Sequence, residues 1–220
     1  MSQKLVKLAP TPVPAEPDKK ENIIYHARNL FQQKSFDAVN IREIMQAASV
    51  SQPTIYYYFQ NKDGLFLTVL LDILDEIDRE INRATRELNV YDQLQHIAQA
   101  FMEAPAPNLP MLFQELRQRV QLNQQFPEQG ITPDQARPAF LFVNQIWPRG
   151  LENILREARR TGDAALDNPT FTAHYLLTVF TAYPHSPFNS HIGRNKDLSV
   201  AALMDNLKNT LKMINVGAQI

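Results

Sequence analysis

Two closely spaced helix-start signals, at Asn40 and Ser51, constrain the fold of this chain more than any other feature. Glu43 follows Asn40 by three residues, a capping-box arrangement with Asn in the place of Ser or Thr. Ser51 precedes Pro53, and proline is tolerated in the first turn of a helix. Residues 49–51 form a tight turn between these signals. Two short helices joined by about three residues, after a longer helix that begins near Glu21, predict a helix-turn-helix.

Apolar residues at helical spacing support the first two of these helices. The first helix places a set of apolar residues on one face: Ile23, Ile24, Ala27, Leu30 and Phe31. The second does the same with Ile41, Ile44, Met45 and Ala48. Both faces are expected to bury against the third helix.

The third helix carries TIYYYF, residues 54–59, and its rings cannot all face the core. At about 100° per residue, Ile55, Tyr58 and Phe59 form one apolar stripe. The opposite face consists of four residues: Pro53, Thr54, Tyr56 and Tyr57. That face bears hydroxyl groups and rings but no charge, and it is free to enter a DNA major groove, whose width admits one helix.

The rest of the chain continues the helical pattern, with Pro-rich breaks that include a predicted loop over 126–138, which contains Pro133 and Pro138. A long helix follows Gly64, and further helices are expected at about 92–103, 111–125, 139–161, 169–183 and 198–215. The fold class is therefore predicted to be all-α, with about nine helices. The domain organisation is predicted as a disordered arm over 1–20, a helix-turn-helix domain over 21–66 and a larger ligand-binding and dimerisation bundle over 67–220. The arm is either an inert tail or a basic arm that touches nucleic acid.

Composition excludes several classes of function. The chain has no cysteine, so it has no disulfide, thiolate nucleophile or thiolate metal site. Four of the five histidines, at 96, 174, 185 and 191, show no metal-ligand spacing with carboxylates, and neither a metal nor a cofactor is expected. No nucleophile–base constellation or phosphate-binding Gly loop appears, so we expect no enzyme. With no signal peptide and no membrane-length apolar run, the predicted location is cytoplasmic, without a membrane partner.

Residues 22–70 resemble the DNA-binding signature of the tetracycline-repressor (TetR) family of bacterial transcription regulators. The similar positions are Ala27, Leu30, Phe31, Ile44 to Ala48, Val50, Ser51, Thr54, Ile55, Tyr56, Tyr58, Phe59, Asn61, Lys62, Asp63 and Leu65. Ser35 and Ser49 stand where the family usually has Gly. If Ser49 adopts a left-handed conformation, it costs about 1–2 kcal/mol relative to Gly.

The resemblance implies which residues meet DNA. Gln52, Pro53, Thr54, Tyr56 and Tyr57 would approach bases or phosphates, and Lys62 resembles the phosphate-contacting lysine after the recognition helix. Asn40, Ile41 and Arg42 open the second helix, whose N-terminus favours a phosphate. Arg28 and Lys34 are either phosphate contacts or solvated surface residues, and the surface interpretation is favoured.

The resemblance also implies a ligand cavity and a dimer interface in the bundle. The expected cavity residues are Phe101, Met102, Phe113, Leu116, Arg117, Phe142, Trp147, His174 and Tyr175; a plain core is the alternative for the aromatic ones. Pro148 is expected to kink its helix and free a carbonyl group. The expected dimer residues are Leu176, Val179, Phe180, Tyr183, Leu203, Leu207 and Leu211, with an intramolecular core as the alternative.

These observations together predict a homodimeric, sequence-specific regulator of transcription that acts as a repressor on a palindromic operator. By the resemblance, a small apolar or aromatic effector enters the bundle, moves the helix that starts near Leu65 and lowers operator affinity. One alternative is a DNA-binding regulator without a small-molecule inducer. The other is a helical ligand-binding bundle whose N-terminal module mediates protein contacts.

Overall fold

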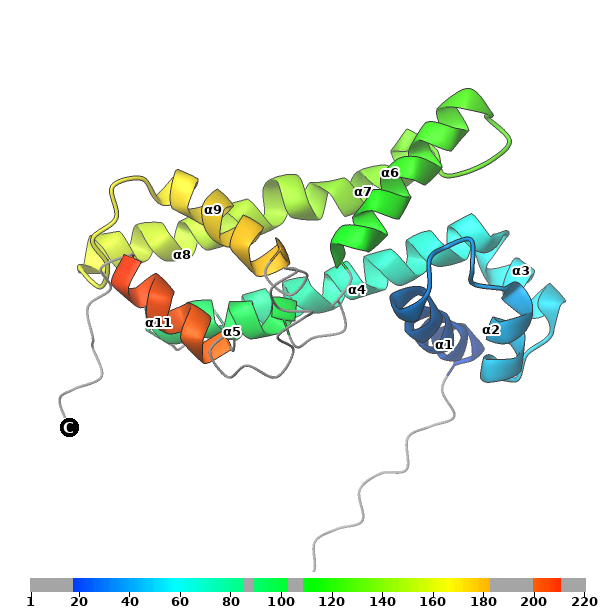
Figure 1. Ribbon diagram of the computed structural model, residues 1–220, viewed down its shortest axis with the longest axis horizontal. Coiled ribbons are helices and arrows are strands. Elements are labelled where there is room, and N and C mark those ends of the chain that lie inside the picture. Colours follow the sequence, from blue (N-terminus) through cyan, green and yellow to red (C-terminus); the bar gives the residue numbers. More distant parts are fainter. Residues whose placement is uncertain (1–17, 85–88, 103–108, 183–199, 211–220) are drawn as a thin grey trace, which may run out of the picture.

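The computed structural model describes residues 18–84, 89–102, 109–182 and 200–210, and these residues form helices and no strand (Figure 1). The predicted all-α fold with an N-terminal helix-turn-helix is confirmed. The first three helices are α1 (Lys19–Gln33), α2 (Ile41–Ala48) and α3 (Gln52–Phe59). The others are α4 (Lys62–Ala84), α5 (Val90–Met102), α6 (Leu109–Gln125), α7 (Pro133–Leu141), a π-helical turn η1 (Phe142–Ile146), α8 (Trp147–Thr161), α9 (Pro169–Ala182) and α11 (Val200–Thr210).

Helices α1, α2 and α3 gather at one end of the long helix α4 and form what we call the head (Figure 1). Its core consists of the apolar positions that the periodicity indicates, including the fully buried Ile23, Ile44 and Ile55. Phe36 adds a ring to this core and packs edge-on against Phe66 of α4, with 5.4 Å between centroids. The head is therefore fixed to α4 by burial of large apolar side chains.

Helix α4 begins at Lys62, before the predicted start after Gly64. The Asn61 side chain explains the difference, because its Oδ1 accepts the Gly64 backbone N–H at 2.8 Å in the manner of an N-cap. From there α4 continues without a break through residues 66 and 67, where the sequence was divided into two domains. The head and the rest of the described chain, which we call the body, share this one helix.

Two turns of the head adopt left-handed backbone conformations. Ser49 has φ 55° and ψ 42°, so the residue that replaces the family's usual Gly does adopt the strained conformation. Gln60, between α3 and α4, has φ 64° and ψ −49°, and the Asn61 N–H donates to the Phe59 carbonyl at 2.7 Å across it. This is the geometry of a γ-turn, a rare and strained conformation.

The prediction of a loop over 126–138 is wrong, because α7 occupies its second half. Thr132 and Gln135 form a reciprocal capping box, and Pro133 occupies the first turn, where its missing N–H costs nothing. The expected helix over 139–161 instead runs from α7 through η1 into α8. The Trp147 N–H donates to the Phe142 carbonyl, one residue further back than in an α-helix, just before Pro148.

Within the body, α5 and α8 pack against the C-terminal part of α4, α9 packs on α8 and α11 packs on α5, while α6 and α7 project beside the head (Figure 1). Four of the predicted dimer residues lie in this core: Leu176, Phe180, Leu203 and Leu207, which are at most 8 % exposed. Within one chain these four side chains form an intramolecular core, the alternative to a dimer interface, so they offer no exposed surface to a second copy. Val179 is half-buried, and Tyr183 and Leu211 lie outside the described residues.

Across the ranges that the structure describes, no helix combines the length and apolarity that crossing a membrane needs.

Candidate nucleic-acid interface and ligand cleft

Helix α3 presents an uncharged, aromatic face to solvent. Tyr57 is 82 % exposed and Tyr56 41 %, whereas Ile55 is fully buried behind them. Pro53 and Gln52 are exposed on the first turn of the same helix. The Gln52 Nε2 donates to the Tyr56 hydroxyl oxygen at 3.1 Å, so the amide and the phenol are held together one turn apart. The predicted facing of this helix is confirmed.

A hollow of about 480 Å³ lies beside this face. Six of the nine predicted DNA-binding residues line it: Asn40, Ile41, Arg42, Gln52, Tyr56 and Lys62. The Asn40 Oδ1 accepts the Arg42 N–H at 2.9 Å and so caps α2 as predicted. The α2 N-terminus therefore faces the hollow with its partial positive charge, and Arg42 and Lys62 add full charges. This combination suits a phosphate group.

Lys62 sits at the head's junction with α4. Its Nζ lies 4.3 Å from the centroid of the Phe36 ring, a cation–π contact. Burial holds the pKa of Lys62 below its ordinary value, and the nearby Asp37 carboxylate opposes that shift. Asp37 itself lines the hollow and was missed in the sequence, because nothing in its local pattern distinguishes it from a solvated acid.

Three of the predicted DNA-binding residues lie outside the hollow. Pro53 and Tyr57 are exposed on the adjoining surface of α3. Thr54 is only half-exposed, and its Oγ1 lies 2.8 Å from Ser51 Oγ. Ser51 occupies the N-cap position but makes no side-chain hydrogen bond to the helix backbone, contrary to its expected capping role.

Ion pairs hold the head together. Arg28, only 14 % exposed, reaches from α1 to two carboxylates of α4, at 3.3 Å to Asp72 and 2.6 Å to Glu76. Lys34 pairs with Glu43 at 2.9 Å. The expectation of simple surface positions is wrong for Arg28, which is a structural link between α1 and α4.

An apolar cleft of about 340 Å³ opens between α6, α7, η1 and α9. It is lined by Leu109, Pro110, Phe113, Arg117, Phe140, Val143, Asn144 and Thr181. The rings of Phe113 and Phe140 lie 6.0 Å apart within it. Arg117 is exposed and brings a positive charge to an otherwise mostly apolar lining. Of the predicted ligand residues, Phe113 and Arg117 are in this cleft.

The other predicted ligand residues lie elsewhere. Phe101, Leu116 and Trp147 are buried core, and the Phe101 and Trp147 rings pack edge-on at 5.1 Å. Phe142 is half-buried and packs against Trp147 at 5.8 Å. His174 and Tyr175 face solvent from α9, because that helix buries Leu176 and Phe180 instead, and neither lines the apolar cleft. The Met102 side chain lies outside the described residues.

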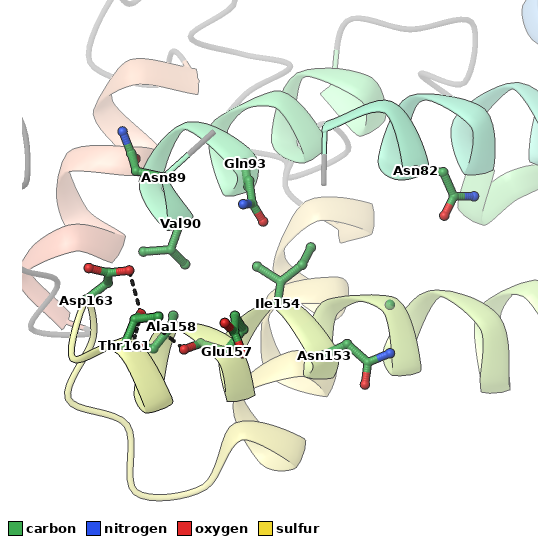
Figure 2. Close-up of a pocket in the computed structure, with 11 residues that line it drawn as sticks. Asn82, Asn89, Val90, Gln93, Asn153, Ile154, Glu157, Ala158, Thr161 and Asp163 are labelled. Atoms are coloured by element: carbon green, nitrogen blue, oxygen red, sulfur yellow. Dashed lines mark hydrogen bonds between the residues drawn. The ribbon is translucent and has the colours of Figure 1, made fainter. Parts of the chain in front are cut away.

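A second, more polar hollow of about 470 Å³ lies between the end of α4, the start of α5 and α8 (Figure 2). Figure 2 shows amide side chains from all three helices around it, namely Asn82, Asn89, Gln93 and Asn153. The Thr161 hydroxyl donates to Asp163 at 2.6 Å on its rim. None of the predicted ligand residues lines this hollow. In the described part of the chain, no cluster of histidine and carboxylate side chains could hold a metal ion.

Comparison with known proteins agrees with this geometry. Residues 23–69 match the model of the bacterial regulatory proteins of the tetR family. Residues 23–69 therefore form a DNA-binding domain of the TetR family of transcriptional regulators. The matched segment covers α1, α2, α3 and the start of α4, which are the helices that build the exposed face of α3 and its neighbouring hollow.

The relatives are similar over different lengths. The transcriptional regulator AcuR of Cereibacter sphaeroides is 24% identical over 62% of this chain, and the match spans only 60% of AcuR. EthR of Mycobacterium tuberculosis is 24% identical over 88% of this chain and 85% of its own length. The solved structure of AibR in complex with isovaleryl coenzyme A and operator DNA shares the fold, with a TM-score of 0.62 at 15% identity over 88% of this chain and 98% of AibR. These relatives are transcriptional regulators and not enzymes.

Proposed function

We propose that this TetR-family protein is a homodimeric repressor that binds a palindromic operator and is released from it by a small, largely apolar or aromatic effector. The observation that carries the proposal is the uncharged, exposed face of α3 beside a positively charged hollow at the N-terminus of α2. A groove-reading helix and a phosphate site on one surface are the two parts that operator binding requires.

On this proposal, α3 enters the major groove and reads bases without charged side chains. Gln52 pairs with an adenine edge, and Pro53 or Thr54 contacts a thymine methyl group. The tyrosine hydroxyl groups of Tyr56 and Tyr57, together with Lys62 and the α2 N-terminus, hold phosphates. Because few of these contacts are cationic, we expect a modest dependence of operator affinity on salt.

Two such helices are needed for a palindrome, so the protein is proposed to act as a dimer. The core role of Leu176 and Phe180 moves the proposed interface to the outer face of α9. There Phe171 is 69 % exposed and Tyr175 46 %, one helical turn apart. To read a palindrome, such a dimer must hold its two α3 helices about 34–36 Å apart, one turn of DNA.

The effector is proposed to occupy the cleft beside Phe113. Its lining is mostly apolar with a few polar groups, which is the usual character of a small-molecule site. The cleft residues belong to α6 and to the irregular region around η1. The effector must bind the non-operator conformation more tightly, since a ligand with equal affinity for both conformations shifts nothing.

A regulator without a small-molecule inducer is the second candidate function. One observation favours it: Phe101 packs on both Trp147 and Phe180 in the core. These buried rings occupy space that an interior ligand would need. Mass spectrometry of the denatured, purified protein distinguishes the two. A co-purified small molecule supports the effector, and identical operator affinity with and without that molecule at saturation refutes effector-driven release.

The proposed operator binding is tested by selecting duplexes from a random pool with purified protein at fixed salt. We expect enrichment of a palindrome with half-sites about one turn apart. No enrichment by a folded protein, after removal of any co-purified molecule, would refute sequence-specific DNA binding. Sedimentation of Phe171→Asp and Tyr175→Asp variants tests the dimer face; both are expected to shift the protein toward monomer.

A further inference from the structure

A cluster of charged side chains joins the head to α6. Arg119 of α6 forms a bidentate ion pair with Asp63 of α4. Its Nε donates to Oδ1 at 2.6 Å and its Nη2 donates to Oδ2 at 3.1 Å. The two side chains are only 17 % and 16 % exposed. A bidentate ion pair with little solvent access is expected to be stronger than an exposed ion pair with a single contact.

The same arginine shares an aromatic ring with Lys62. The Arg119 Cζ lies 4.4 Å and the Lys62 Nζ 4.3 Å from the centroid of the Phe36 ring. Lys62 also lines the hollow beside α3. One side of this cluster is therefore part of the proposed phosphate site, and the other side belongs to the body.

The backbone of Arg119 is held in place as well. Its carbonyl oxygen accepts the Ile131 N–H at 3.2 Å. A Cβ on Gly130, which has φ +73°, would lie 2.2 Å from that oxygen, so the turn after α6 can approach it this closely only with glycine. Arg119 is thus fixed both at its carbonyl and at its guanidinium group.

Helix α6 presents two different groups of side chains on opposite faces. Phe113 and Arg117 line the apolar cleft. Glu115 and Arg119, offset from them by about 200° around the helix axis, belong to the charged cluster. A displacement of α6 caused at the cleft is therefore transmitted to the Arg119–Asp63 pair by a single rigid element.

We propose that Arg119 is a positioning residue for operator binding: it neutralises Asp63 and thereby leaves Lys62 available to a DNA phosphate. This role rests on the proposed function. When α6 moves and Arg119 withdraws, the Asp63 carboxylate is left uncompensated directly beside Lys62. It then competes with the phosphate for the lysine ammonium and repels the DNA backbone. The carboxylates of Asp37 and Glu115 also attract the Lys62 ammonium group, and the positive charge of Arg119 opposes that attraction.

The test measures the affinity of the full-length protein for its selected operator as a function of salt. Arg119→Gln is expected to weaken binding at least tenfold and to flatten the salt slope by about 0.9 per half-site, because one phosphate contact is lost. Adding Asp63→Asn to Arg119→Gln is expected to restore affinity to within about threefold of wild type, because the competing carboxylate is gone. Arg160→Gln, which removes an exposed two-pronged pair with Glu157 on α8, is the control and leaves both quantities unchanged.

Two results overturn this role while the wild type still binds its operator: unchanged binding by Arg119→Gln, or weak binding that Asp63→Asn does not restore. The second result would mean that the ion pair only orients the head. Absence of DNA binding by the wild type would instead refute the proposed function and this role with it. Thermal melts of all variants establish that each is folded.

Discussion

The Tyr57→Ala variant tests the proposed DNA interface without disturbing the core of the head. The side chain is 82 % exposed, and its ring makes one edge contact with Tyr58, at 5.1 Å between centroids. Replacing it with alanine is expected to change the free energy of unfolding by less than about 1 kcal/mol. For a chain of this size that corresponds to a change in Tm of no more than about 2–4 °C.

The effect on operator binding is expected to be much larger. A hydrogen bond to a charged group contributes about 1.5 kcal/mol at the low end, and a dimer loses two of them. About 3 kcal/mol corresponds to a loss of affinity of roughly 100-fold. Fluorescence anisotropy with the selected operator at fixed salt measures this change. Tyr57→Phe separates the two parts of the side chain, since it keeps the ring and removes only the hydroxyl group.

Tyr25 of α1 provides a matched control. It is 62 % exposed and likewise makes one edge contact, with His26 at 5.2 Å. We expect Tyr25→Ala to lower Tm as little as Tyr57→Ala and to leave operator affinity unchanged. If Tyr57→Ala unfolds the head, the facing of α3 is wrong. If both variants bind the operator like wild type, Tyr57 makes no contact with DNA.

Three further changes test the backbone and the electrostatics. Ser49→Gly is expected to raise the free energy of unfolding by about 1 kcal/mol in urea titrations, because it relieves a left-handed serine; no gain would argue against strain there. Gly64→Ala is expected to lower stability by more than about 2 kcal/mol, because its Cβ would lie 2.2 Å from the Phe59 carbonyl oxygen. Gly150→Ala, whose Cβ has no neighbour closer than 3.9 Å, is its control and should be neutral or stabilising in the same titration. Burial raises the pKa of Glu115, so wild-type stability falls as pH rises from the unfolded-state value of 4.5 through the higher folded-state pKa. Glu115→Gln should therefore melt at a higher temperature than wild type at pH 7 and lose that advantage at pH values below 4.5; a constant difference would contradict the assigned cause.

The head was predictable because its signals are local. Asn40 and the apolar spacing of α1 and α2 specify two helices whose apolar faces are buried in one core. The facing of α3 followed from the 100° period alone. Errors arose where a polar side chain formed a hydrogen bond that the pattern did not indicate. Ser51 bonds the Thr54 hydroxyl group instead of the helix backbone. Asn61 accepts the Gly64 N–H, and α4 therefore starts before the glycine.

The body was less predictable because its apolar stripes fit a core and an interface equally well. Leu176 and Phe180 have the spacing of either, and only the packing of α9 on α8 and α5 decides for the core. Two prolines in the body also led to a wrong prediction of secondary structure. Pro133 and Pro138 were interpreted as loop residues, yet both lie in α7. Pro133 occupies the first turn, where no backbone hydrogen bond is lost and Thr132 caps the helix, and Pro138 lies inside the helix.

The charged cluster at the junction illustrates a limit of a different kind. Asp63 and Arg119 are 56 residues apart, and each looks in the sequence like one more charge on a solvated helix face. They meet because α4 passes from the head into the body while α6 folds back beside it (Figure 1). Periodicity fixes which face of α6 is buried, but it does not say which helix covers that face. The residues proposed to link the cleft to the DNA surface are therefore those that local pattern is least able to identify, and the restoration of Arg119→Gln by Asp63→Asn tests them directly.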